Sequence, residues 1–497
     1  MTSSHRTGGI AIMPSTYAAC VVLLLALVSL SSAASPGFRT ELTQKGLDYI
    51  RSVGLPILEQ EIGQITIPDI SGDTDDTSYS LSSIRVTSFN IPTSSVAIVP
   101  GTGVTVAGSG ATMTLHGNWH YRMDWWPHVS DSGTCDVSIS DVSMSFTLTV
   151  GADAKGHATI SCDACSANIG HMGIDFHGGA SFLYNLFSSE IAGSIKGSVA
   201  PQICSAGKSA INTQGNAALE SLPIIVAIDD NTEIDYGLIA PPAYDNVNFL
   251  ETVHKGEFYL TKQPTEAPYV PAALPAASQF DRMMYIWLTA YMADTAGYVY
   301  EQSGILHYTI TPAMVPSSIP IKLNTESFKD IVPALYKAFP NMPINLAVNN
   351  TAPMTMNISE TLITGLIPGT VQVLVQQPNG TEAEAFVLSA LIHANATAWT
   401  HSNNSKVYVS AKAVYMFTEL SLVSTNIGQF NVALLDVAVN ALAGLGVIPF
   451  INSYTVPGIE IPIVDGVALV NPTLQLGQGY AVVATDFSYK PSYKFKN

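Results

Sequence analysis

Apolar residues recur along the chain with two different spacings, which predict helices and strands in separate segments. Between residues 42 and 62 they approximate the three-and-four spacing of an amphipathic helix, and Pro56 is where that helix should bend. Residues 80–115 and 135–163 instead alternate apolar and polar side chains with a period of two, as half-buried strands do. The first part of the chain therefore combines a helix with long strands.

The segment 135–163 predicts a long hairpin whose first arm contains an irregularity. Val137 and Ile139 share one face, and residues 142–150 then alternate in the opposite phase, so we expect a β-bulge near Asp141. Residues 151–156 supply the turn. Long, bulged and twisted strands are typical of a sheet that wraps around something.

Helical spacing returns over residues 181–220, and a proline-rich passage then separates two halves of the chain. The second half again mixes strands and helices: it predicts a strand over 283–288, helices before Gly304 and after Phe328, and a late helix over 430–445. We therefore place a domain junction in the proline-rich passage and expect a duplicated architecture.

The N-terminus has the order of a secretory signal peptide over residues 1–34. Arg6 precedes an apolar run over residues 21–30, and small residues follow at 32–34. No later stretch reaches about 18 uninterrupted apolar residues, the length that a membrane-spanning helix needs. We expect a secreted, extracellular protein whose mature chain starts near Ser35.

Composition and charge narrow the classes of partner. Of 497 residues, 47% are apolar and only 12% are charged, so much apolar surface must be hidden from water. Acidic residues outnumber Lys and Arg by 38 to 20, and residues 35–240 alone carry a net charge of −13. This balance leaves no basic face for nucleic acid, so a nucleic-acid partner is excluded.

The cysteines predict disulfide chemistry rather than a metal site. Cys20 leaves with the signal peptide, and the four that remain permit three pairings in an oxidising route: Cys135, Cys162, Cys165 and Cys204. Cys162 and Cys165 have the spacing of half a zinc site, but no second such pair completes it. We therefore expect no metal and no other cofactor.

N-glycosylation sequons crowd into one segment of the second half. They begin at Asn349, Asn357, Asn379, Asn395 and Asn403. Sequons also arise by chance, but five within so short a span, behind a signal peptide, favour an exposed and glycosylated segment.

Several fragments, in order from Pro36 to Gly428, resemble the family of lipopolysaccharide-binding protein, bactericidal permeability-increasing protein and the cholesteryl ester and phospholipid transfer proteins. The front fragments are Pro36-Gly37-Phe38-Arg39, Gln44-Lys45-Gly46-Leu47-Asp48-Tyr49 and Ile67-Pro68-Asp69. The later ones are Lys255-Gly256-Glu257-Phe258-Tyr259, Asp281-Arg282-Met283, Ala296-Gly297-Tyr298-Val299-Tyr300 and Asn426-Ile427-Gly428.

This resemblance implies an α+β boomerang of two barrels, each a twisted antiparallel sheet with helices, joined by a central antiparallel sheet. We accordingly expect an N-terminal lipid-binding barrel over 35–230, central strands and the proline-rich linker over 231–280, and a C-terminal lipid-binding barrel over 281–497 whose last strand returns to the central sheet. The resemblance also implies a disulfide between Cys165 and Cys204. Cys135 either pairs with Cys162 or stays free.

Two helical stripes are candidates for the wall of the first lipid pocket. Our hypothesis assigns that wall to Leu47, Ile50 and Val53 of the first helix and to Phe182, Leu186 and Ile191 of the second. The alternative is that these six residues form ordinary core, because one apolar stripe can do either.

The segment from Trp119 to His128 is a candidate membrane contact, because it joins two predicted strands and tryptophan favours the membrane interface. We predict that Trp125 and Trp126 touch the membrane; the alternative is that both pack beneath the loop. The cationic barrel tips that the resemblance implies for endotoxin binding are missing, since the stretch over 71–76 is acidic and the tryptophan loop holds one arginine, Arg122.

Lipid binding and transfer is thus the function we expect, with a phospholipid or other acyl lipid as partner and a membrane or lipoprotein surface as transient contact. Innate-immune recognition of lipopolysaccharide or other bacterial envelope lipid is the alternative. An enzyme is not expected, because the nucleophile-elbow, zinc-helix, P-loop and dinucleotide motifs are all missing from the sequence.

Overall fold

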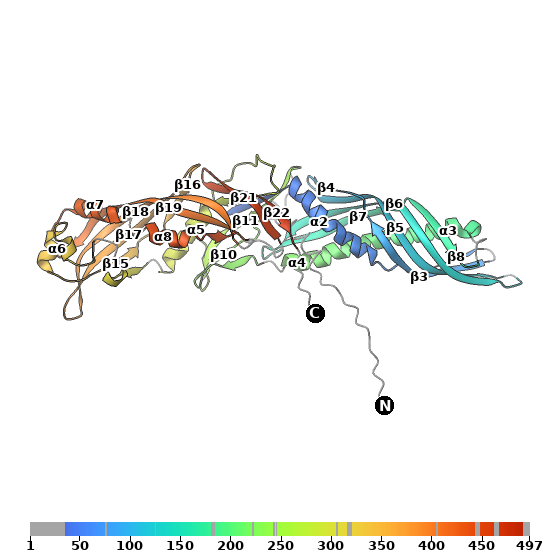
Figure 1. The fold of residues 1–497 in the computed structure, drawn as a ribbon, viewed down its shortest axis with the longest axis horizontal. Helices are drawn as coiled ribbons and strands as arrows, with labels where there is room; N and C mark the ends of the chain where they lie inside the picture. Colours follow the sequence, from blue (N-terminus) through green and yellow to red (C-terminus); the bar gives the residue numbers. More distant parts are fainter. Residues whose placement is uncertain are drawn as a thin grey trace, which may run out of the picture.

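A computed structural model shows an elongated α+β molecule with two sheet-and-helix barrels placed end to end and a central sheet between them (Figure 1). It describes residues 35–490 except 75–76, 125, 180–183, 221–222, 242–243, 245, 305–306, 316–320, 404–405, 443–447 and 462–466. The predicted fold class is confirmed.

The N-terminal barrel is an antiparallel sheet that curls around two helices. Its strands, in spatial order, are β2 (Ile70–Thr74), β3 (Thr77–Asn90), β5 (Gly103–Met123), β6 (Ser130–Ala152) and β7 (Ala158–Asn168), with β4 (Thr93–Val99) on β5 and β8 (His171–His177) on β6. Its helices are α2 (Gln44–Gly63) and α3 (Tyr184–Ser209), followed by a π-helical turn η1 (Ala210–Gly215) and α4 (Asn216–Glu220).

The bulge predicted near Asp141 is present. Ala111 of β5 pairs with Val142, Met113 pairs with Ile139, and the register slips between them. Asp141 itself has φ of +55°, a left-handed conformation that Asp tolerates better than bulky residues do. The slip keeps apolar residues on the inner face on both sides of the bulge, and Val137, Ile139 and Val142 are all buried.

The central sheet joins segments that are far apart in the sequence. Its strands, in spatial order, are β11 (Phe249–His254), β1 (Phe38–Thr43), β13 (Met284–Thr289), β22 (Tyr480–Tyr489) and β21 (Val467–Gly477). A smaller sheet beside it contains β12 (Glu257–Leu260), β10 (Thr232–Asp235) and β9 (Ile225–Ala227). The first and last strands of the described chain therefore lie in one sheet, which ties the two barrels together.

The C-terminal barrel repeats the design. Its strands, in spatial order, are β14 (Tyr308–Ile310), β15 (Ile344–Asn350), β17 (Ile363–Gln376), β18 (Glu382–Asn403), β19 (Lys406–Thr425) and β20 (Ile459–Glu460), with β16 (Thr355–Ile358) on β17. Its helices are α5 (Ala290–Gln302), α6 (Pro333–Ala338), α7 (Val432–Leu442) and α8 (Ile448–Thr455).

Candidate lipid-binding site

Helix α2 runs along the inside of the N-terminal sheet and supplies half of the predicted pocket wall. It begins where the Thr43 side chain accepts a hydrogen bond from the backbone N–H of Gly46, an N-cap contact. Leu47 and Ile50 are buried in the main apolar cluster, whereas Val53 is only half-buried. The first turns of α2 thus lie in packed core, the apolar residues between Val53 and Leu58 are half-buried, and Ile62 in the last turn is buried again.

Helix α3 packs against α2 and the sheet and carries a narrow apolar stripe at every fourth residue. Ile191, Ile195, Val199 and Ile203 are all buried. One turn further, Gly207 continues the stripe without a side chain, because a Cβ there would lie 2.3 Å from the ring of Phe146 on β6. This close approach brings the helix directly onto the sheet.

A disulfide joins the same part of α3 to the sheet. Cys165 on β7 and Cys204 on α3 are bonded, with their Cα atoms 5.7 Å apart. This is the pairing that the resemblance implies. Cys135 and Cys162 are free and buried. They are far apart along the sheet, because Cys135 of β6 pairs with Gly117 of β5, whereas Cys162 of β7 pairs with Leu148, thirteen residues further along β6. The open alternative for Cys135 is therefore resolved in favour of a free thiol.

The predicted pocket residues have different surroundings. Leu47, Ile50 and Ile191 belong to one apolar cluster, so the structure brings the two predicted stripes together. Phe182 lies outside the described residues, as does the side chain of Leu186, whose backbone is in α3.

The inner face of the sheet is closed at some positions and accessible at others. Met113, Leu115 and Phe146 are buried, but the inward residues paired with them are only half-buried; these are Phe89, Val86 and Val106. Half-buried Val53, Leu55 and Ile57 lie on the second half of α2, which packs against β3 and β4. Sequence reasoning missed this apolar region, because periodicity shows which side chains face inward but not how completely they are covered.

The C-terminal barrel is closed at its far end and less densely filled towards its middle. Val373, Phe386 and Leu388 are buried in a cluster with Leu435 of α7. Further along the same inward face, the paired residues Ile367 and Ile392 remain half-buried.

Asparagine side chains attach helices to the free edge of the N-terminal sheet. Asn216 accepts from the backbone N–H of Ile160 (2.9 Å) and donates to the carbonyl of Ile160 (2.7 Å). Asn212 of the π-helical turn accepts from the N–H of Cys162 (2.7 Å). Each amide thus takes the place of a missing neighbouring strand, which satisfies edge groups that would otherwise stay unpaired.

The C-terminal barrel uses the same device on β19. Asn440 of α7 accepts from the N–H of Thr418 (2.6 Å) and donates to its carbonyl (2.9 Å). Asn452 of α8 makes the same pair of bonds to Ala413, at 2.8 and 3.1 Å. In both barrels, therefore, polar amides close the seam between helix and sheet edge, and the interior is left to apolar groups.

The tryptophans at the end of the N-terminal barrel do not all lie in a loop, as was expected for the segment that begins at Trp119. Trp119 belongs to strand β5 rather than to a loop, and its ring is buried, with Nε1 donating to the carbonyls of Thr134 and His177. The reason is that β5 continues to Met123. Trp126 is 83% exposed in the short connection to β6, and Trp125 lies outside the described residues.

Acidic and histidine side chains accompany this end. Asp136 accepts from His116 (2.7 Å) and His177 (2.8 Å), and these hydrogen bonds lower the pKa of the Asp136 carboxyl. Within the described ranges, no group of three or more His, Cys, Asp or Glu side chains is suited to hold a metal ion. The surroundings of Trp126 are therefore mixed in charge rather than cationic, with Arg122 beside Asp124.

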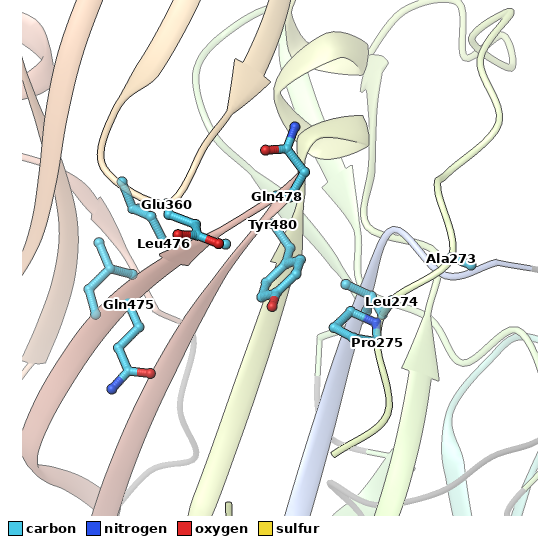
Figure 2. A pocket seen from close by; sticks show the side chains of 10 residues that line it. Ala273, Leu274, Pro275, Glu360, Gln475, Leu476, Gln478 and Tyr480 are labelled. Carbon is cyan, nitrogen blue, oxygen red and sulfur yellow. The ribbon is translucent and has the colours of Figure 1, made fainter. Parts of the chain in front are cut away.

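A separate depression of about 900 Å³ opens beside the central sheet (Figure 2). The proline-rich segment forms one wall with Leu274 and Pro275, and the tip of the β21–β22 hairpin forms the other. Glu360 and Gln475 make it partly polar, and the predicted pocket residues are not among those that line it.

Two curled sheets with apolar interiors, joined through a shared central sheet, define a tubular two-barrel protein. The chain belongs to the LBP / BPI / CETP family: residues 46–213 match the N-terminal domain of that family and residues 226–489 match its C-terminal domain. The resemblance carried by the sequence fragments is thus confirmed.

Individual relatives match along almost their whole length. Bactericidal permeability-increasing protein of Sebastes schlegelii is 30% identical over 475 residues, covering 95% of this chain and 99% of that protein. Lipopolysaccharide-binding protein of Homo sapiens is 27% identical, covering 94% and 97%. The crystal structure of a lipopolysaccharide-binding protein matches 92% of this chain with a TM-score of 0.62 at 24% identity, which supports the fold.

Proposed function

We propose that the protein is a secreted lipid-binding and lipid-transfer protein that shelters acyl chains of phospholipid-like molecules in its barrels. The observation that carries the proposal is the apolar inner face of each curled sheet, which holds half-buried residues such as Phe89 and Ile392 beside fully packed core. At such partly covered apolar positions, an acyl chain of a lipid can contact the protein without displacing a packed side chain.

The energetics favour exchange between the protein and a membrane. Burial from water is worth about 0.8 kcal/mol per methylene, so a two-chain lipid with about thirty methylenes gains roughly 20 kcal/mol and does not escape into water unaided. In a bilayer those chains are already dry, so pocket and membrane are nearly balanced. Transfer on contact then has a small net free energy.

We assign the first pocket to the space between the second half of α2 and the inward side chains of β3 and β5. Val53 is the predicted pocket residue that is partly accessible there, and Leu47, Ile50 and Ile191 pack in the core beside it. Phe182 and Leu186 stay predictions. A phospholipid with a photoactivatable acyl chain tests this assignment. Labelling of α2 near Val53 is expected, and labelling that misses both helices would contradict it.

We assign membrane contact to the exposed tip at Trp126, with Trp125 as its predicted partner. The test is transfer of a fluorescent phospholipid between neutral vesicles by the full-length protein, comparing Trp126→Ala with the conservative Trp126→Phe. The alanine variant should transfer severalfold more slowly and the phenylalanine variant close to wild type. Equal rates for all three would remove the tip from the mechanism.

Native mass spectrometry of the purified protein, followed by lipid extraction, tests lipid binding itself. A bound acyl lipid is expected after mild purification, and its absence together with failure to take up vesicle lipid would refute the proposal. A binding role rather than a catalytic one is consistent with the relatives, whose names, lipopolysaccharide-binding protein and bactericidal permeability-increasing protein, state no reaction.

Recognition of bacterial lipopolysaccharide is the second candidate, favoured by the name of the human relative and of the matched crystal structure. Charge does not favour it: residues 35–240 carry a net charge of −13, and repulsion from an anionic surface acts over about 8 Å at physiological salt. A preference for lipopolysaccharide over neutral phospholipid vesicles that persists at high salt would select this candidate.

A further inference from the structure

The outer face of the C-terminal sheet carries two glycosylation sequons in one cross-strand row. Asn357 of β16 pairs with Thr364 of β17, Thr364 pairs with Asn395 of β18, and Asn395 pairs with Tyr415 of β19. The residues flanking this row, such as Ile358 and Met416, are buried on the inner face. Because side chains alternate along a strand, all four members of the row point outward.

Apolar side chains surround the row on the same outer face. Leu366 is 41% exposed, Val414 is 50% exposed and Tyr415 is 55% exposed. Phe417 completes the set and stacks on His393, with ring centroids 4.3 Å apart. We call these four residues, Leu366, Val414, Tyr415 and Phe417, the outer apolar patch. Adjacent exposed apolar side chains of this kind are candidates for a surface that something else covers.

We propose that N-linked glycans on Asn357 and Asn395 are that occupant, so that the outer apolar patch is covered by carbohydrate. In the modification, the side-chain amide nitrogen bonds to the anomeric carbon of a lipid-linked oligosaccharide diphosphate. The bond from that carbon to the diphosphate breaks, the amide loses one proton, and the diphosphate leaves. The sequons Asn357-Ile358-Ser359 and Asn395-Ala396-Thr397 satisfy the acceptor rule.

The spacing of the row suits two glycans side by side. Neighbouring strands lie about 4.8 Å apart, so the two asparagines, separated by strand β17, are about 10 Å apart. Directly opposed side chains have Cβ atoms about 5 Å apart, which places the first sugar on Asn395 beside the Tyr415 ring. The C–H groups of a sugar ring can cover an aromatic face while its hydroxyls stay in water.

This covering has a consequence for how the protein meets other surfaces. A glycan over the centre of the sheet keeps the broad outer face of the C-terminal barrel away from membranes and from protein partners. Asn379, by contrast, lies in the turn between β17 and β18, and Asn403 is the last residue of β18, so neither belongs to the row that runs past Tyr415. Asn379 caps its own turn by accepting from the Thr381 backbone N–H.

The test uses full-length protein secreted from cultured animal cells. Glycopeptide mass spectrometry measures occupancy of Asn357 and Asn395, and hydroxyl-radical footprinting measures the accessibility of Tyr415. Thr397→Ala removes the Asn395 sequon at an exposed position, and Thr397→Ser retains it as the matched control. Thr381→Ala removes the Asn379 sequon as a control for loss of a distant glycan.

We expect both sites to be occupied and radical labelling of Tyr415 to rise severalfold in Thr397→Ala only. Continued protection of Met416, which is buried on the same strand β19 as Tyr415, verifies that the C-terminal barrel of the variant is folded. If it is not folded, wild type before and after enzymatic removal of N-glycans under native conditions gives the same comparison. Unmodified Asn395 in the secreted protein would overturn the proposal. Equal labelling of Tyr415 with and without the glycan would also overturn it, because the patch would then be either open to solvent or covered by something other than carbohydrate, such as a membrane or a second protein.

Discussion

A buried carboxyl group in the central sheet should make the stability of the protein depend on pH. Glu41 of β1 is 1% exposed, and burial raises its pKa to about 7 even though Arg39 lies 2.8 Å away and acts in the opposite direction. Its cross-strand partner Glu251 is also acidic, and burial raises the pKa of that carboxyl as well. One arginine therefore serves two carboxyl groups beneath the proline-rich segment, to which Arg39 donates at Pro275.

Proton binding by Glu41 is linked to folding, and this linkage sets the sign and size of the change in the free energy of unfolding with pH. Because the pKa of Glu41 is higher in the folded state than its ordinary value of 4.5, the folded state holds the proton more tightly. The contribution of this group to the free energy of unfolding is therefore fully present below pH 4.5 and is lost as pH rises to about 7. A shift of this size corresponds to about 3 kcal/mol.

The perturbation that tests this is Glu41→Gln, which keeps the shape and removes the titration. We expect the variant and wild type to unfold at similar temperatures near pH 4.5, and the variant to be more stable above pH 7. For a cooperative unit of one barrel or of the whole chain, about 3 kcal/mol corresponds to roughly 3–6 °C in the melting temperature.

The assay is scanning calorimetry of both proteins from pH 4.5 to 8. Glu419→Gln serves as the control, because that side chain is 62% exposed and solvent screens its charge. A difference between Glu41→Gln and wild type that stays constant across this range, within the about 0.5 kcal/mol typical of surface changes, would refute the reasoning.

Other predictions concern contacts that hold the barrels closed. Asn440→Ala removes both hydrogen bonds from α7 to β19 and should cost about 1–3 kcal/mol, seen as faster amide hydrogen exchange in β19 but not in β6. Gly207→Ala should destabilise by about 1–3 kcal/mol, and Phe146→Leu in the same chain should restore part of the loss in thermal unfolding. Replacing Cys165 and Cys204 together by serine opens a loop with a sequence separation of 39 and should cost about 4 kcal/mol, measured by denaturant unfolding.

Periodicity predicted those parts of the fold that depend on local alternation. It located the α2 segment, the β6–β7 hairpin and the bulge at Asp141, because each has its own apolar pattern and the bulge reverses the phase of that pattern. It was wrong about Trp119. Trp119, Tyr121 and Met123 continue the alternation of β5 on the inner face of the sheet, whereas the cluster of aromatic and histidine residues suggests a loop.

The contacts that close the barrels could not be predicted from the sequence. Asn216, Asn440 and Asn452 are ordinary polar positions on amphipathic helices, and only the tertiary position of an edge strand gives each amide its two backbone partners. The same holds for half-buried Phe89 and Ile392, because their accessibility depends on how far the helices cover the sheet.

The two halves share an architecture but differ in what they can present to a lipid surface. The N-terminal half is acidic, so an approach to an anionic membrane is opposed at long range, yet its exposed Trp126 offers an uncharged contact at short range. If glycans occupy Asn357 and Asn395, the broad outer face of the C-terminal barrel is too hydrophilic and too bulky to lie on a bilayer. The protein then contacts a lipid surface through the N-terminal tip at Trp126. This contact favours neutral lipid surfaces and an end-on approach of the elongated molecule.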